Sequence, residues 1–162
     1  NKRTKKPIKI LMLALLMMWG YKIMRKAYMD TFEQEKAIDT LARTAWGEAR
    51  GDGRKGIQAV INVVMNRVKH GGWWGANVID VCKKPAQFSA WNENDPNYQK
   101  MMNVTRADEW FDLAYVLART AITDELPDIT GGATHYHAKS INPKWAVSLN
   151  KTATIGNHIF YV

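Results

Sequence analysis

Apolar residues recur at helical spacing in three segments of this 162-residue chain, which restricts its fold more than any other feature. In the second segment the spacing is i, i+3, i+4, i+7 and i+11. The three stripes are Ile38, Leu41, Ala42, Ala45, Trp46 and Ala49; then Ile57, Val60, Ile61, Val64 and Val68; then Ala107, Trp110, Phe111, Ala114, Leu117, Ala118 and Ala121. The sequence therefore predicts helices over about 30–50, 54–69 and 105–124.

Turn and capping signals set the expected ends of these helices. Asp30 or Thr31 is the expected N-cap of the first, because Thr31 and Gln34 match a capping box. The GDG of 51–53, the Gly71-Gly72 pair and Pro127 end the three helices in turn. A loop-rich stretch is expected over 71–104, and two short strands over 133–138 and 158–162. These elements predict an α+β fold that is mainly helical.

Charge divides the chain into two parts. Residues 1–29 hold eight of the 23 Lys and Arg residues and no acid, so residues 30–162 hold 23 − 8 = 15 bases and all 15 acids. The formal net charge of +8 therefore belongs to residues 1–29, which we call the leader. A nucleic-acid-binding face on residues 30–162 is not expected. The single cysteine, Cys82, excludes an intramolecular disulfide framework.

The leader resembles a membrane element. Ile10–Tyr21 carries no charge and follows a basic start. Residues 8–24 would reach about 25 Å as a helix, against a hydrocarbon core of about 30 Å, if Lys9 and Lys22 snorkel outward. No small-x-small cleavage site follows. We therefore expect an uncleaved signal-anchor over 8–24 with the domain 30–162 outside; a cleaved signal peptide, a surface-lying helix and a helix that docks on other proteins are the alternatives.

Glu48 is the first candidate for chemistry. At 100° per residue it lies about 90° from the centre of the first apolar stripe, so its carboxyl is expected at the margin of the buried face. Partial burial would raise its pKa and allow it to act as a general acid. On periodicity alone, a Glu at such a border is more often a solvated or capping residue.

The histidines and aromatic residues are the other candidates. His135 and His137 alternate along a predicted strand, and His158 lies on the other strand, so the three could hold a zinc ion. The HxH pattern alone is a weak indication of a metal site. Trp73, Trp74, Phe88 and Trp91 lie in the loop-rich stretch, where exposed rings could stack on sugars or could instead fill the core.

Four blocks of sequence together resemble the SleB/CwlJ cell-wall hydrolases, the spore cortex-lytic enzymes and their relatives in bacteria and phages. They are LARTAWGEARGDGRKGIQAVINVVMNRVKHGGW, CKKPAQFSAW, GATHYHAKSINPKWA and TIGNHIFYV, and they cover about 38–162. The resemblance implies a lysozyme-like domain, related to goose-type lysozymes and lytic transglycosylases, that acts on the glycan strands of peptidoglycan. It also implies that Glu48 is the catalytic acid, and a phage endolysin is one form that such a protein takes.

Further site residues follow from the same resemblance. The family's Q-F-S block falls on Gln87, Phe88 and Ser89, and its aromatic strand on His135, Tyr136 and His137. His137 or Ala138 stands where the related goose-type motif has Asn, which is a departure. Tyr136 and His137 are expected to orient the substrate's acetamido group. Gln87, Phe88 and Trp91 are expected to line the cleft.

The resemblance marks no second catalytic carboxylate. Asp52, Asp80, Glu93 and Asp95 are available, but none lies at a position that the family motifs mark. A glycosidase needs a second carboxylate at a set distance, whereas a lytic transglycosylase can use the substrate's own groups. We therefore predict a lytic transglycosylase without a cofactor, at the bacterial envelope. A zinc amidase that uses His135, His137 and His158 and a non-catalytic wall-binding membrane protein remain alternatives.

Overall fold

The computed structural model describes residues 5–162, and side chains from residue 12 onward. One compact unit ends at Lys36 and the other comprises Ala37–Val162. Helix α1 (Lys5–Ala49) runs through this division without a break. The predicted helix start at Asp30 or Thr31 is therefore wrong. The Thr31 hydroxyl donates a hydrogen bond to the Ala27 carbonyl, one turn back in the same helix, and does not cap a new one.

The first unit carries apolar side chains that are largely exposed. Those from Met12 to Phe32 along α1 are between 45 and 70 % exposed: Met12, Leu13, Leu15, Leu16, Met17, Met18, Trp19, Tyr21, Ile23, Met24, Tyr28, Met29 and Phe32. Within the described residues, no helix has a stretch both long and apolar enough to cross a bilayer. The signal-anchor predicted over 8–24 is thus not supported, because Lys9, Lys22 and the nearby bases leave too short an uncharged run. Residues 1–4 of the predicted basic leader lie outside the described part.

Helices α2 (Gly53–His70) and α5 (Glu109–Ile122) complete the helical core of the second unit. Helix α2 ends where Gly71 takes a left-handed φ of 63°, as the glycine pair predicted. Helix α5 begins later than expected, because the Asp108 side chain accepts a hydrogen bond from the Phe111 backbone N–H and caps the helix there. Trp110, expected in the core, lies in the first turn of this helix and is 45 % exposed.

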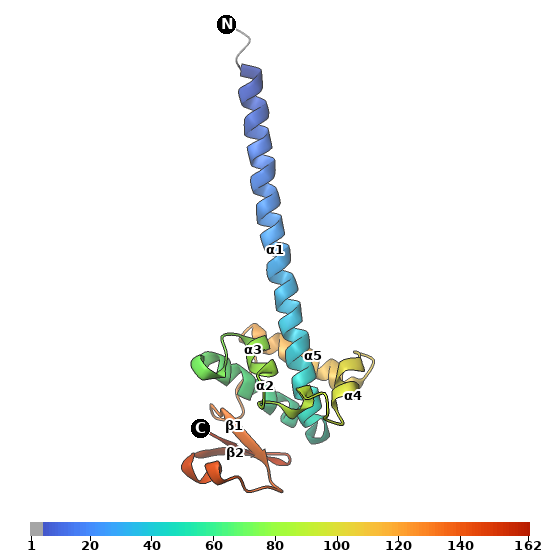
Figure 1. Cartoon of the computed structure of the whole chain (residues 1–162), viewed down its shortest axis with the longest axis vertical. Coiled ribbons are helices and arrows are strands. Elements are labelled where there is room, and N and C mark those ends of the chain that lie inside the picture. The colour runs from blue at the N-terminus through green and yellow to red at the C-terminus, as the bar shows by residue number, and fades with distance from the viewer. Residues whose placement is uncertain (1–4) are drawn as a thin grey trace. The chain divides into compact units, whose positions relative to one another are not determined.

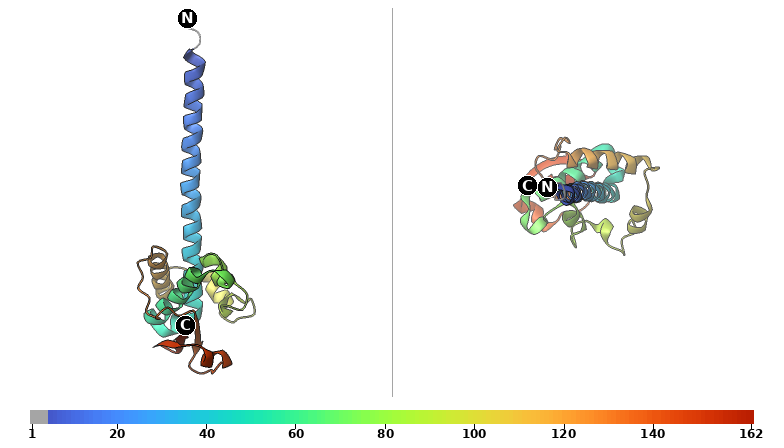
Figure 2. Two further views of the ribbon diagram at one scale, coloured as in Figure 1. Left: turned by 90° about the vertical axis from the view of Figure 1, so that its left-hand side faces the viewer. Right: turned by 90° about the horizontal axis from the view of Figure 1, so that it is seen from above.

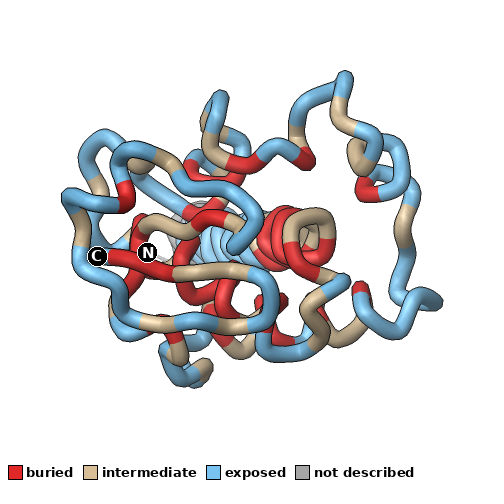
Figure 3. The backbone as a smooth tube through the Cα atoms, turned by 90° about the horizontal axis from the view of Figure 1, so that it is seen from below, coloured by how far each residue is buried: buried red, intermediate tan, exposed pale blue. Residues whose placement is uncertain are grey.

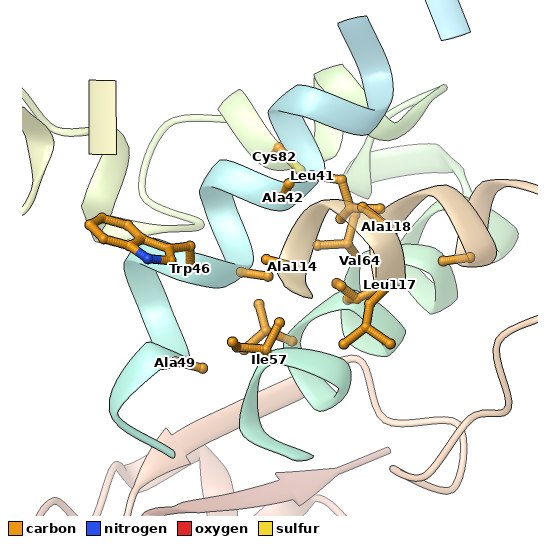
Figure 4. Packing of buried hydrophobic residues seen from close by; sticks show 14 of the residues in the cluster. Leu41, Ala42, Trp46, Ala49, Ile57, Val64, Cys82, Ala114, Leu117 and Ala118 are labelled. Carbon is orange, nitrogen blue, oxygen red and sulfur yellow. The ribbon is translucent and has the colours of Figure 1, made fainter. Parts of the chain in front are cut away.

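The core lies between the end of α1, α2 and α5, as Figure 4 shows. All six predicted apolar positions of α1, from Ile38 to Ala49, are at most 5 % exposed, and Ile57, Val60, Ile61 and Val64 of α2 are fully buried. Cys82 packs into the same cluster. Seen from below, most buried residues of this unit lie toward its centre, and exposed loops lie around them (Figure 3).

The predicted loop-rich stretch contains short helical pieces. These are α3 (Val78–Lys83) and α4 (Tyr98–Asn103), with single 3₁₀ turns at Gly72–Trp74 and Ser89–Trp91. Another 3₁₀ turn, Arg50–Asp52, joins α1 to α2, and Lys144–Ser148 forms a further one. The Asn77 side chain caps α3 by accepting from the Asp80 backbone N–H. The fold is therefore mainly helical α+β, as predicted.

A three-stranded antiparallel sheet closes one end of the helices of this unit (Figures 1 and 2). Its strands are β1 (His135–Ala138), β2 (Lys151–Ile155) and β3 (His158–Tyr161), in the order β1-β3-β2. Strands β1 and β3 were expected and β2 was not. Tyr136 pairs with Phe160, and Ala138 with His158, so these four side chains share one face; His135 and His137 share the other.

Candidate active site

Glu48 lies in the last turn of α1, and two other segments of the chain reach its carboxyl. The Ala90 backbone N–H donates to Oε1 at 3.1 Å, and the Tyr136 hydroxyl donates to Oε2 at 3.1 Å. Tyr136 is itself held by stacking on Phe160, with ring centroids 5.6 Å apart. Three segments distant in sequence therefore fix the orientation of this carboxyl: the helix end, the 3₁₀ turn at 89–91 and strand β1.

Gly47 makes the approach of the 3₁₀ turn possible. A Cβ atom at Gly47 would lie only 2.8 Å from the Cβ of Ala90. The absence of that atom allows Ala90 to sit directly against α1, where its N–H reaches the neighbouring Glu48. The glycine before Glu48 therefore serves close packing beside the carboxyl.

Burial raises the pKa of Glu48 above its ordinary value of 4.5. The hydrogen bonds from Ala90 and Tyr136 act in the opposite direction, since they stabilise the carboxylate. Repulsion from Asp95 raises the pKa and attraction to His158 lowers it, and burial outweighs the lowering contributions. The pKa of Tyr136 is well above 10, chiefly because of burial, so its hydroxyl keeps its proton for Glu48. This is the environment of a carboxyl that can deliver a proton.

Glu48 opens into a cavity of about 270 Å³. Its lining also includes Arg67, Ala86, Gln87, Ser89, Asn92 and Tyr136. A second cavity of about 250 Å³ is lined by Arg67, Trp73, Trp74, Ala86, Gln87, His135, Tyr136 and Trp145. Four residues line both cavities, so the two adjoin. We refer to them together as the groove; Glu48 lines the first cavity, and several aromatic rings line the second.

The structure separates the predicted cleft residues into two groups. Of the predicted substrate-binding residues, Gln87 and Tyr136 line the cavity of Glu48; Ser89 of the Q-F-S block, which had no predicted role, lines it too. Phe88 is 2 % exposed and belongs to the core, and Trp91 packs against that core with its Nε1–H donating to the Thr44 hydroxyl at 2.9 Å. Neither lines the cavity of Glu48 or the adjoining one. The alternative stated for the aromatic residues, that they fill the core, applies to these two.

His137 lies away from Glu48. It is on the face of the sheet opposite to Tyr136, is 7 % exposed, and its Nε2 lies 2.9 Å from the Tyr161 hydroxyl. The β period of two explains the difference, because neighbouring residues of a strand point to opposite faces. Tyr136 and His137 therefore could not both reach the carboxyl.

The three-histidine zinc site is wrong for the same reason. His158 pairs with Ala138 and so shares a face with Tyr136, whereas His135 and His137 point to the other face. Within the described residues, no group of three His, Cys, Asp or Glu side chains could hold a metal ion. His158 is instead bound to a carboxylate, with its Nδ1 2.7 Å from Asp52 Oδ2.

Asp52 connects the helical core to the sheet. Its carboxylate accepts hydrogen bonds from His158 and from the Asn157 side chain, the latter also at 2.7 Å, and its side chain is 5 % exposed. Gly156 leaves room for it, since a Cβ there would lie 2.6 Å from Asp52 Cγ. Both carboxylate oxygens of Asp52 thus accept hydrogen bonds, and neither Asp52 nor the three other carboxylates considered from the sequence, Asp80, Glu93 and Asp95, lines the cavity of Glu48.

Sequence reasoning missed two groups of the site. One is the Ala90 backbone N–H, for which the glycine at position 47 was the available signal. The other is Arg67, buried at 6 % exposure, whose Nε donates to the Thr134 carbonyl at 2.8 Å and whose Nη1 donates to Gln87 Oε1 at 2.9 Å. A charged residue within the helical stripe of α2 could have indicated it.

The chain is similar in sequence and in fold to known cell wall hydrolases. The cell wall hydrolase family model matches residues 51–161, a range that begins three residues after Glu48. The catalytic domain of the germination-specific lytic transglycosylase SleB from Bacillus anthracis is similar at 27 % identity and a TM-score of 0.62, over 78 % of this chain and 93 % of that one. The catalytic domain of Bacillus cereus SleB is similar at 26 % identity and a TM-score of 0.59, over 78 % and 89 %. No curated protein matches. The chain therefore belongs to the cell wall hydrolase family, as its sequence motifs implied.

Proposed function

We propose that this protein cleaves the glycan strands of peptidoglycan as a lytic transglycosylase, with Glu48 as the acid and then the base. The observation that carries the proposal is the half-buried Glu48 carboxyl, whose pKa is raised and which faces a groove. The similarity to SleB, described as a lytic transglycosylase, supports the choice of reaction. Membership of the cell wall hydrolase family supports the choice of polymer and of the cell wall as the place of action.

The reaction begins with protonated Glu48. It donates its proton to the oxygen that joins N-acetylmuramic acid to the next sugar, and the bond from C1 to that oxygen breaks. The acetamido group of the same muramic acid stabilises the positive charge that develops at C1. The C6 hydroxyl oxygen then attacks C1 while the Glu48 carboxylate accepts the hydroxyl proton. The product carries a 1,6-anhydro end, no water is consumed, and Glu48 is again protonated.

The lining of the cavity supports this route over hydrolysis. Among the described residues that line it, Glu48 is the one carboxylate. A retaining glycosidase needs a second carboxyl about 5–5.5 Å away, and an inverting one needs it about 6.5–9.5 Å away with water between. Intramolecular attack avoids this requirement and gains from the held geometry of the C6 hydroxyl. Tyr136 and Gln87 are the polar side chains that we assign to orienting the acetamido group.

Analysis of the products tests this assignment. The purified full chain is incubated with peptidoglycan, and the soluble fragments are analysed by mass spectrometry. Fragments that end in 1,6-anhydromuramic acid are expected, 18 Da lighter than hydrolysed ones because one water is absent. New reducing ends would contradict the transglycosylase and make Asp95, whose charge acts on Glu48, the carboxylate to examine. Free stem peptides would contradict glycan cleavage altogether.

A further inference from the structure

Arg67 is a buried cation in the groove that forms no ion pair among the described residues. Its guanidinium has five N–H donors, and the two hydrogen bonds it makes are both to uncharged acceptors, the Thr134 carbonyl and the Gln87 amide oxygen. None of the ion pairs in the described part of the chain includes Arg67. Glu48 is the carboxylate that acts on Arg67 electrostatically, but it makes neither a hydrogen bond nor an ion pair with the guanidinium, and it is protonated when the proposed reaction begins.

One nitrogen of Arg67 faces the groove. Nη2 makes no hydrogen bond to the described residues. Every fully buried side-chain nitrogen or oxygen of the described residues has a hydrogen-bond partner. Nη2 is therefore not fully buried, and the two adjoining cavities that Arg67 lines are the openings beside it. Burial lowers the pKa of Arg67 to about 10, which leaves the guanidinium charged at neutral pH. A charged donor is thus presented to whatever fills the groove.

Aromatic rings surround this donor. The Arg67 guanidinium lies 4.4 Å from the Trp74 ring centroid, and the Trp74 and His135 rings meet edge to face at 5.1 Å. Trp73 is 66 % exposed and Trp145 is 37 % exposed, and both line the same cavity. Exposed indole faces provide stacking surfaces for the apolar faces of sugar rings. A cation enclosed by such rings suits a sugar that carries an anionic substituent.

We propose that Arg67 and the aromatic rings around it form a subsite for a carboxylate-bearing sugar next to the bond that Glu48 cleaves. The proposal rests on the proposed function, which supplies the polymer. Peptidoglycan offers carboxylates from two sources: the lactyl group of a muramic acid without a peptide, and the stem peptide. Arg67 Nη2 donates to the carboxylate in either case, and the substrate thereby supplies the ion pair that Arg67 does not make among the described residues.

The test changes the substrate and leaves the enzyme intact. Glycan strands stripped of peptides, which carry free lactyl carboxylates, are compared with the same strands after their carboxyls have been coupled to glycinamide. Peptide-bearing strands are treated in the same way. A charge-assisted hydrogen bond of this kind predicts a kcat/KM about 10- to 100-fold lower on the neutralised strands, chiefly through KM. A loss confined to stripped strands identifies the lactyl source, and a loss confined to peptide-bearing strands identifies the stem peptide.

Two variants link the effect to Arg67. In Arg67→Gln, neutralising the substrate is expected to change kcat/KM less than twofold, whereas Arg54→Gln, an exposed position on the same helix, should keep the full difference. Trp73→Ala should weaken binding of charged and neutral strands equally. If Arg67→Gln does not fold, the wild-type comparison and Arg67→Lys, which keeps the charge, still decide.

The proposal is overturned if neutralising the carboxyls changes the wild-type kcat/KM by less than twofold on both substrates, the stripped strands and the peptide-bearing strands. It is also overturned if Arg67→Gln keeps the full difference. A wild-type protein that cleaves no glycan strand would instead contradict the proposed function. The subsite is then tested by calorimetric binding of a muramic-acid-containing tetrasaccharide before and after neutralisation, where equal affinity would reject it.

Discussion

Glu48→Gln is expected to lower kcat on peptidoglycan by about 10³-fold or more, because the amide can neither donate the proton nor take it back. Gln has nearly the same shape and keeps an oxygen that can accept from the Ala90 N–H. The fold should therefore persist. Turnover is measured by the rate at which soluble anhydro fragments appear, and the fold by circular dichroism and thermal unfolding.

Glu125→Gln is the matched control. Glu125 is exposed, follows α5 and lines neither cavity, so this variant should retain wild-type kcat.

The thermal unfolding of Glu48→Gln provides a second check. A folded-state pKa raised by burial means that the wild type loses stability as pH rises through that pKa, a cost that Gln does not have. At neutral pH the Tm of Glu48→Gln should equal or exceed that of the wild type. Release of soluble anhydro fragments from peptidoglycan at the wild-type rate by Glu48→Gln would contradict the assignment of Glu48 as the acid.

Tyr136→Phe is expected to lower kcat by about 10- to 100-fold and to shift its pH dependence. Removal of the hydroxyl leaves Glu48 Oε2 without its donor, so the carboxyl is less firmly oriented. The same hydrogen bond lowers the pKa of Glu48, so its loss raises that pKa further. Since the acid must be protonated, the alkaline limb of the kcat–pH profile should move to higher pH in the variant.

Tyr161→Phe provides the comparison for Tyr136→Phe. The Tyr161 hydroxyl pairs with His137 on the other face of the sheet, away from Glu48. Removing it leaves the acid untouched, so kcat should stay within about twofold of the wild type and the alkaline limb within about 0.2 pH units. A shift of equal size in both variants would show that the effect of Tyr136 is merely structural.

The helical core could be predicted from periodicity because burial of one face decides those positions. Every predicted apolar residue of the α1 stripe from Ile38 to Ala49 is buried, and Glu48 lies at the margin of that face, as its angle on the helix indicated. The start of the helix could not be predicted in this way. A capping-box match has a helical alternative, in which Thr31 bonds to the carbonyl one turn earlier.

The surroundings of Glu48 required tertiary information. Strand register determines that Tyr136 faces the carboxyl and that His137 does not, and no local pattern fixes register where strands are four residues long. Phe88 and Trp91 are aromatic residues in a segment predicted to be loop, but the segment folds against the core, where Phe88 is buried and Trp91 is partly buried. The family motifs indicated segments that surround Glu48 in the structure, but not which side chains of each segment line the groove.

The protonation state of Glu48 is the point on which the mechanism depends. It can be observed directly by carbon NMR of the full chain labelled at the side-chain carboxyls of glutamate, with the Glu48 signal assigned by its absence in Glu48→Gln. We expect that signal to titrate above the ordinary value of 4.5, and Tyr136→Phe to move the midpoint higher still. A midpoint at or below 4.5 in the wild type would mean that the carboxyl is ionised when the substrate arrives, and would contradict its role as the acid.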